Sequence, residues 1–192
     1  SMDVESFVRN DLATSLALAI DSAAINGSGA SNQPTGILNT SGIGSVVGGT
    51  NGAAPDWADI VDLESAVAID NADMGALGFL TNAATRGKLL QTEKASGTAQ
   101  YVWSDSNTLR GYNAAVSNQV PSNGTKGTGT ALSSMVFGNW NDLIIGTWGG
   151  IDINVDTSTG SASGTVRVVA LQDVDIAVRH AESFAAMTDI IT

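Results

Sequence analysis

Apolar residues recur at every fourth position in the first part of the chain. The series runs through Val4, Val8, Leu12, Leu16, Ile20 and Ala24. This period is typical of one face of an α-helix, and it predicts a helix from Asp3, a suitable N-cap, to the Asn26-Gly27 pair. Such a helix is about 35 Å long at 1.5 Å per residue. We expect later elements to bury its apolar stripe, so Leu16→Asp should cost several kcal/mol.

A second helix is predicted after a long polar segment. Residues 27–54 are rich in Gly, Ser, Asn and Thr, and Pro34 disfavours helix, so this segment should form turns. The helix then runs from Pro55-Asp56 to about Asp70-Asn71. Asp56 can act as its N-cap and Asp59 can complete a capping box. The side chains expected on its buried face are Trp57, Ile60, Val61, Leu63 and Val67.

Short elements follow, and strands dominate the last third. The elements predicted up to residue 144 are a strand at 78–81, an Asn82-capped helix at 83–91, strands at 113–120 and 135–137 separated by a loop at 122–130, and a short helix at 139–144. Apolar and polar residues then alternate over 151–156 and again over 166–178, on either side of a Gly/Ser loop at 157–164. Because helices and strands mix without regular βαβ alternation, the pattern predicts an α+β fold.

Composition and charge exclude several classes of partner and of functional site. Hydrophobic residues make up 43% of the 192 residues, which is typical of a globular chain. There are 19 acidic residues against 8 basic ones, a net charge of −11, so phosphate backbones and anionic membranes are repelled. There is no cysteine, which excludes disulfides, thiolate metal sites and thiol nucleophiles. No apolar run approaches the roughly 20 residues of a membrane span.

Candidate chemical groups are few. The single histidine, His180, has no serine or carboxylate tied to it by the sequence, so we interpret it as a surface or packed structural residue. Four carboxylates share the second helix, and the helix dipole explains them more simply than a metal does; they are Asp56, Asp59, Asp62 and Glu64. We therefore predict no catalytic, cofactor-binding or metal site.

Glycine pairs and tryptophans also have simple explanations. Gly27-Ser28-Gly29 and Gly42-Ile43-Gly44 lack the spacing of a phosphate-binding loop and should be turns. The tryptophans could stack on carbohydrate, but they fall in separate elements where core anchors are expected; they are Trp57, Trp103, Trp140 and Trp148. These residues point to a structural or binding protein.

Five segments, taken in order, resemble a known family. They are INGSGASNQPTGIL (25–38), GFLTNAATRGKLLQTEKASGTAQYVW (78–103), LRGY (109–112), VFGNWNDLIIGTWGGIDINVD (136–156) and VRVVALQDVDIAVRHAESFAAM (166–187). The final "Asp–apolar–Ala–Val–Arg–His–x–Glu–x–Phe–Ala" stretch is the most specific. In this order, from Asp3 to Met187, the chain resembles the major capsid proteins of tailed phages, which have the Hong Kong 97 fold.

The resemblance implies an architecture and a function. Residues 1–36 would be the spine helix of the peripheral (P) domain, 37–160 an inserted α/β axial (A) domain, and 161–192 strands that return to the P domain. The protein would be a structural subunit and not an enzyme, would need no cofactor, and would self-assemble into pentameric and hexameric capsomers. These would form an icosahedral shell around DNA, assembled in the bacterial cytoplasm and present in the virion. The two Gly/Ser-rich loops, at 42–54 and 157–164, would serve as crossings or axial loops.

One departure affects assembly. Family members carry an N-terminal arm and an extended hairpin loop before the spine helix, and neither precedes it here. We therefore expect a truncated subunit that is monomeric or forms small oligomers. Covalent cross-linking, known in one branch of the family, also loses support, because its lysine lies in that hairpin and the loop TSTGSASG has no asparagine.

Two alternatives stay open at this stage. An encapsulin, a bacterial shell protein of the same fold, is the close one. A secreted acidic adhesive domain belongs to a different class, and the opening helix and the absence of a visible signal peptide count against it.

Overall fold

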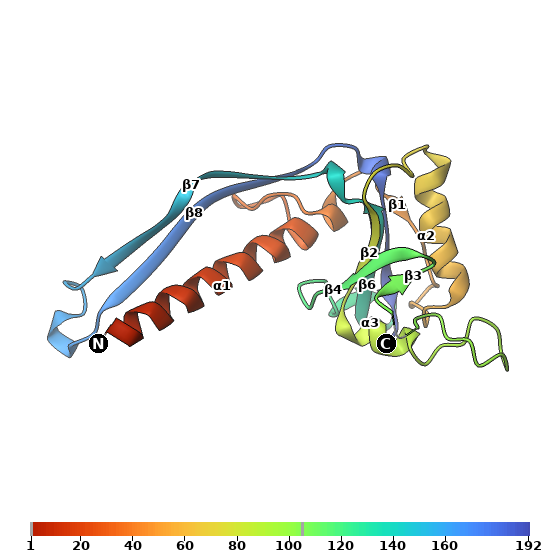
Figure 1. Ribbon diagram of the computed structural model, residues 1–192, viewed down its shortest axis with the longest axis horizontal. Coiled ribbons are helices and arrows are strands. Elements are labelled where there is room, and N and C mark those ends of the chain that lie inside the picture. Colours follow the sequence, from red (N-terminus) through yellow and green to blue (C-terminus); the bar gives the residue numbers. More distant parts are fainter. Residues whose placement is uncertain (1, 105) are drawn as a thin grey trace.

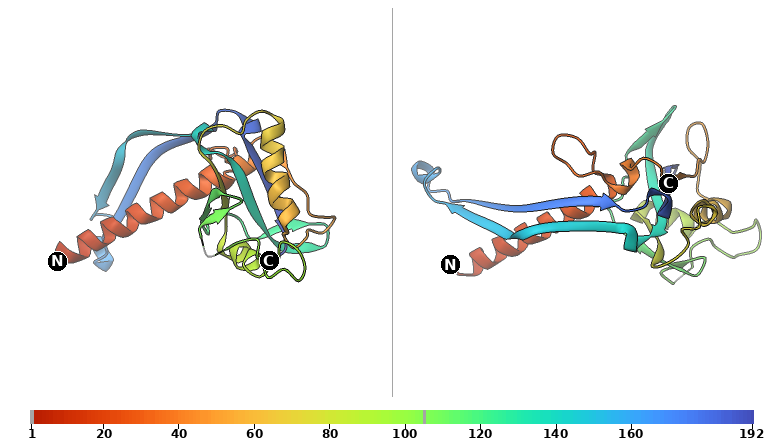
Figure 2. Two further views of the ribbon diagram at one scale, coloured as in Figure 1. Left: turned by 45° about the vertical axis from the view of Figure 1, so that its right-hand side comes forward. Right: turned by 90° about the horizontal axis from the view of Figure 1, so that it is seen from above.

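The computed structural model describes residues 2–104 and 106–192 and has two parts (Figures 1 and 2). One part is an extension made of α1 (Met2–Asn26) and a hairpin of β7 (Leu143–Asp156) and β8 (Arg167–Val178). The other is a compact body that contains the remaining helices and strands. The N-terminus lies at the far end of the extension, and the C-terminus lies in the body (Figure 1).

The predicted opening helix is confirmed, but its N-cap is not. The helix already includes Met2, so Asp3 lies within it. At the other end, Gly27 N donates to Ala23 O over 2.8 Å. A Cβ on Gly27 would lie 2.2 Å from Pro34 O, so only glycine allows the following segment to turn back so closely.

The expectation that α1 buries its apolar stripe is wrong for most of its length. Among the side chains described between Val4 and Asn26, only Ala24 and Ile25, near the body, are buried, while Leu12 and Leu16 are half-buried and Phe7 is exposed. The cause is geometric: the described residues place only a two-stranded hairpin beside the helix, and it is too narrow to cover a broad stripe. A charge at Leu16 can reach solvent here, so it should cost less than predicted.

The body is built around a mixed seven-stranded sheet. Its order is β1-β9-β6-β2-β4-β3, with β5 paired to β6. The bounds are β1 (Gly44–Ser45), β2 (Leu77–Thr81), β3 (Thr108–Leu109), β4 (Tyr112–Val116), β5 (Gly124–Lys126), β6 (Gly129–Asn139) and β9 (Phe184–Ile190). β2 and β4 are parallel and joined through α3 (Ala83–Leu89), so one βαβ unit occurs within the α+β fold.

The two faces of this sheet hold separate apolar clusters. Met135 and Phe137 of β6 pack on one face beneath α2 (Trp57–Ile69), with Leu63 of that helix. Val136, between them in sequence, points to the other face and packs on Ile37 of the short 3₁₀ turn Ile37–Asn39. β6 is therefore buried on both sides, as is β9 beside it.

The N-caps predicted for α2 and α3 are confirmed. The Asp56 carboxylate accepts from Asp59 N over 3.0 Å, and Asp56 N donates to Asp59 Oδ2 over 2.9 Å, which completes the capping box. Asn82 Oδ1 accepts from Thr85 N over 2.9 Å at the start of α3. These bonds satisfy backbone N–H groups that a helix leaves free in its first turn.

Several strand boundaries differ from prediction. The strand expected at 113–120 ends at Val116, and a turn over 117–120 leads to Pro121. The loop expected at 122–130 contains β5 and the start of β6, because Gly127 has a positive φ of 57° and closes a tight hairpin there. The short helix expected at 139–144 is the 3₁₀ turn Trp140–Asp142.

The two strands of residues 161–192 lie in different parts of the molecule. β8 pairs with β7 in the extension, while β9 lies between β1 and β6 in the body. The 157–164 loop is the turn of the β7–β8 hairpin, at the far end of the extension (Figure 1).

An ion pair joins three distant segments of the body. The buried Asp189 carboxylate accepts from Lys126 Nζ over 2.6 Å and from Gly48 N over 3.1 Å, with Gly49 N also in range at 3.4 Å. Burial alone would raise the pKa of Asp189, but Lys126 and these two N–H groups outweigh it and hold the pKa below its usual value. The loop 46–54, the β5–β6 hairpin and β9 thus meet at one carboxylate.

We predict that core and extension differ sharply in sensitivity to truncation. Leu63→Ala, at a side chain with 0% exposure, should lower the free energy of unfolding by about 2–5 kcal/mol because it leaves a cavity. The matched change Leu18→Ala, at 47% exposure, should cost less than about 1 kcal/mol. Chemical denaturation measures both. Equal losses would show that α1 is buried more deeply than the structure indicates.

We also predict that the Asp189 ion pair makes the free energy of unfolding depend on pH in the acidic range. Because the pKa of Asp189 is lower in the folded state, its contribution is complete above the ordinary aspartate value of about 4 and is lost as the pH falls through the folded value. Asp189→Asn should therefore cost about 2 kcal/mol at pH 7, and its difference from wild type should shrink below about pH 4. Urea denaturation between pH 7 and pH 3 measures this. Asp62→Asn, at an exposed carboxylate, is the control; a constant difference for Asp189→Asn would refute the linkage.

Candidate assembly surfaces

The four carboxylates at the start of α2 and along it differ in their contacts. Asp56 and Asp59 form the capping box, and burial raises the pKa of Asp59. Asp62 is exposed, while Glu64 accepts from Arg110 Nε and from Tyr112 Oη. Within 2–104 and 106–192, no three His, Cys, Asp or Glu side chains are grouped so that they could hold a metal ion.

The glycine motifs lie in turns, and the histidine lies at the surface. Gly29 and Gly42 have φ values of 68° and 93°, as glycines in turns do. His180 is exposed, just after β8. In the described part of the chain, no helix is both long enough and apolar enough to cross a membrane.

The tryptophans only partly match the expectation of core anchors. Trp103 is buried and its Nε1 donates to Ser106 O over 3.1 Å. Trp140 and Trp57 are half-buried, and Trp140 packs edge-on against Phe184. Trp148 is 61% exposed on β7, so the expectation is wrong there. Strand alternation places Trp148 on the hairpin face that looks away from α1, where no described residue covers it.

Trp148 is one of many large apolar side chains that stay exposed on the two faces of the extension. Large apolar side chains stay exposed along α1, β7, β8 and the turn between the strands; they are Val4, Phe7, Leu18, Ile144, Ile145, Trp148, Ile151, Val155, Val166 and Leu171. Between α1 and the hairpin lies a hollow of about 420 Å³, lined by Val4, Val8, Arg9, Ile153, Val155, Val166 and Val168. We call these residues together the extension surface.

The extension surface has the properties of an interface. An exposed apolar area of this extent is uncommon on a monomer and marks a site where another surface packs. A two-stranded hairpin is also marginally stable by itself. Within the described residues β7 pairs only with β8, so its outer backbone edge is open to another strand.

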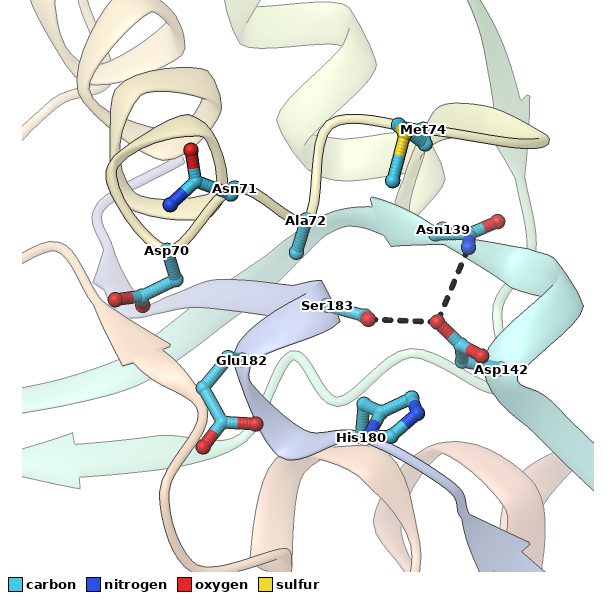
Figure 3. Close-up of a pocket in the computed structure, with 9 residues that line it drawn as sticks. All are labelled: Asp70, Asn71, Ala72, Met74, Asn139, Asp142, His180, Glu182 and Ser183. Carbon is cyan, nitrogen blue, oxygen red and sulfur yellow. Dashed lines mark hydrogen bonds between the residues drawn. The ribbon is translucent and has the colours of Figure 1, made fainter.

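A second hollow lies where the extension joins the body (Figure 3). This acidic pocket, of about 460 Å³, is lined by Asp70, Asn71, Ala72, Met74, Asn139, Asp142, His180, Glu182 and Ser183. They come from the end of α2, the turn before β7 and the turn before β9. Asp142 Oδ2 accepts from Ser183 Oγ over 2.6 Å and from Asn139 Nδ2 over 3.0 Å, which fixes the two turns to each other.

Sequence reasoning did not identify either surface. The apolar residues of the extension were visible, but a pattern cannot distinguish a stripe covered by the same chain from one covered by another. The acidic pocket combines residues from 70 to 183, and only the sheet order brings them together.

A family model described as "Phage capsid family" matches residues 1–189. The major capsid protein of Halomonas phage phiHAP-1 is 34% identical over 185 residues, which cover 96% of this chain and 28% of that protein. The chain thus spans little more than a quarter of this curated relative.

Solved structures show the same fold. The capsid of an empty GTA particle computed with C5 symmetry matches with a TM-score of 0.74 at 23% identity, over 98% of this chain and 66% of that one. An encapsulin complex, holo-SrpI from Synechococcus elongatus PCC 7942, matches with a TM-score of 0.62 at 17% identity, over 95% and 65%. The fold is therefore of the Hong Kong 97 type. With a family model that covers residues 1–189 and a 34% identical capsid relative, this chain belongs to the phage capsid family.

Proposed function

We propose that this chain is part of the major capsid subunit of a tailed phage or prophage, and that copies of it associate into an icosahedral shell around DNA. The observation that carries the proposal is the extension surface, because apolar side chains in such number need a partner. Family membership supports the choice of partner, which is another copy of the same chain.

The two-part shape supports a division of labour within a capsomer. We assign the extension to the peripheral domain and the body to the axial domain, which would meet its copies at the centre of pentamers and hexamers. This keeps the expected split but moves β7 to the peripheral side and β9 to the axial side. The five-fold symmetry of the GTA capsid supports ring-shaped assembly.

Charge supports the role of a container. A net charge of −11 disfavours contact with DNA phosphates, so a shell of such subunits can enclose DNA without sequence-specific binding. The subunit would be assembled in the bacterial cytoplasm and reside in the virion. It would act as a structural protein and not as an enzyme, in keeping with its family.

The alternatives now differ in support. An encapsulin shares the fold but is a distant neighbour at 17% identity. A cargo-enzyme gene beside this one would favour an encapsulin, and terminase or portal genes would refute it. The family assignment gives no support to a secreted adhesive domain.

The 192-residue chain alone should be monomeric at low protein concentration and form small oligomers, but not closed shells, at high concentration. Its matched relatives are longer, and their additional residues would take part in shell contacts. Light scattering that detects closed shells of this chain would refute this.

We predict that self-association depends on the extension surface. Trp148→Ser and Val166→Ser should each weaken association about tenfold or more, because they remove apolar area from an interface. The thermal midpoint should hardly change, since both side chains are exposed. Sedimentation velocity over a concentration series measures association.

Val47→Ser is the matched control. Val47 is 63% exposed on the body, close to the 58% of Val166, and lies outside the extension surface. Equal effects of the two valine changes would count against the extension as the contact, and wild-type chain that stays monomeric at the highest concentrations would refute self-association itself.

A further inference from the structure

Contacts between like-charged copies of this chain are favoured where opposite charges meet. The net charge of −11 makes random approach of two copies unfavourable. Two of the eight basic residues are neutralised internally, Arg110 by Glu64 and Lys126 by Asp189. Three others, Arg86, Lys88 and Lys94, lie within nine positions of one another in sequence.

Arg86 and Lys94 form a basic patch with an aromatic rim. The Arg86 guanidinium lies 5.9 Å from the Trp103 ring centroid, and Lys94 Nζ lies 4.4 Å from that of Trp57. Lys94, Trp103 and the exposed Tyr101 line one hollow of about 590 Å³. We define the basic patch as Arg86, Lys94 and Tyr101. The segment that follows α3 protrudes from the body (Figure 1).

The acid nearest the patch in sequence is already engaged. The Glu93 carboxylate accepts from Gly97 N over 2.7 Å, so it holds the loop in shape. The positive charge of the patch therefore faces solvent beside exposed aromatic area. Such a surface suits a partner that offers carboxylates next to apolar side chains.

The acidic pocket offers that combination. The C-cap residue of α2 is Asp70, and the last helical turn has no basic residue, so a carboxylate lies at the negative end of the helix dipole. Asp73 and Glu182 add charge nearby, and in the described part of the chain the carboxylates of Asp70, Asp73 and Glu182 have no hydrogen bond or ion pair. Two apolar side chains flank the acids: Ile69 is 78% exposed and Met74 is 71% exposed.

We propose that the basic patch of one copy docks into the acidic pocket of a second copy. The inference rests on the proposed function, because it names the contact that would join neighbours within a capsomer. Lys94 contacts Trp57 at the start of α2, while the pocket begins at Asp70, just past its end. A helix of 13 residues is about 20 Å long, so one copy cannot satisfy itself. Two different patches on each copy make a head-to-tail contact, which closes into rings.

The first test uses cross-linking. The chain has no cysteine, so introduced thiols are the only ones. Ala95→Cys chains mixed with Met74→Cys chains should give a dimer with a short thiol-reactive cross-linker, and the double variant should give a ladder, because both exposed positions lie beside the proposed contact and leave its charges in place. Ala95→Cys mixed with Asp62→Cys, which lies midway along α2, is the control. Equal yields with Asp62→Cys, or no dimer in either mixture at high protein concentration, would overturn the proposal.

The second test reverses charges. Lys94→Glu and Asp70→Lys should each weaken association about tenfold, and combining them should restore most of it, because the pair is re-formed with opposite polarity. Asp62→Lys, with the same charge change, should not restore Lys94→Glu. Sedimentation velocity measures these effects, and thermal midpoints exclude misfolding. Failure of the double reversal to restore association would overturn the proposal.

The outcomes separate this inference from the proposed function. Oligomers that form through the extension surface without the 95–74 cross-link would leave the capsid function standing and remove this contact. The cross-link in chains whose association does not depend on the extension surface would support the contact and count against the observation that carries the proposed function. Binding of a short DNA duplex that Lys94→Glu abolishes, with no cross-link, would assign the patch to nucleic acid and overturn the proposal.

Discussion

The burial of β6 and β9 on both faces is the constraint on which the rest of the structure depends. Each strand offers side chains to two apolar clusters, so α2 must cover one face and the segment around Ile37 the other. That segment follows α1 directly and ties the body-side end of the helix, where Ala24 and Ile25 are buried, to the sheet. The extension is thus anchored at one end, and its orientation follows from the packing of the body.

Beyond this anchored end, the exposure of apolar side chains differs between the body and the extension. The body buries most of its large apolar side chains, whereas the extension leaves most of its own exposed to solvent. A chain can tolerate this only if the extension is covered in its working state, which is the condition of a subunit whose stability is shared with its neighbours. The overall acidity opposes the approach of two copies, and a contact that pairs a basic site with an acidic one offsets this repulsion.

The starts of α2 and α3 depend on residues close together in sequence and were predicted correctly. The caps at Asp56 and Asn82 are short-range hydrogen-bond patterns, and both helices begin where expected. β9 was missed because a strand buried on both faces, FAAMTDI, shows no alternation. The exposure of Trp148, the shallow burial of Leu16 and the acidic pocket depend on which elements come together in space. The family resemblance supplied the fold class.

The position of β9 in the sheet has a consequence for the order of events during synthesis. Asp189 bonds Gly48 across 141 positions, and β1 is held at the edge of the sheet by β9 alone among the described strands. Contacts of such long range form late in folding. The body therefore stays incomplete until β9 has left the ribosome, and the acidic pocket, which needs Glu182 and Ser183, is completed at the same stage. A nascent chain with an exposed extension thus lacks a finished docking site, which delays association until folding is nearly over.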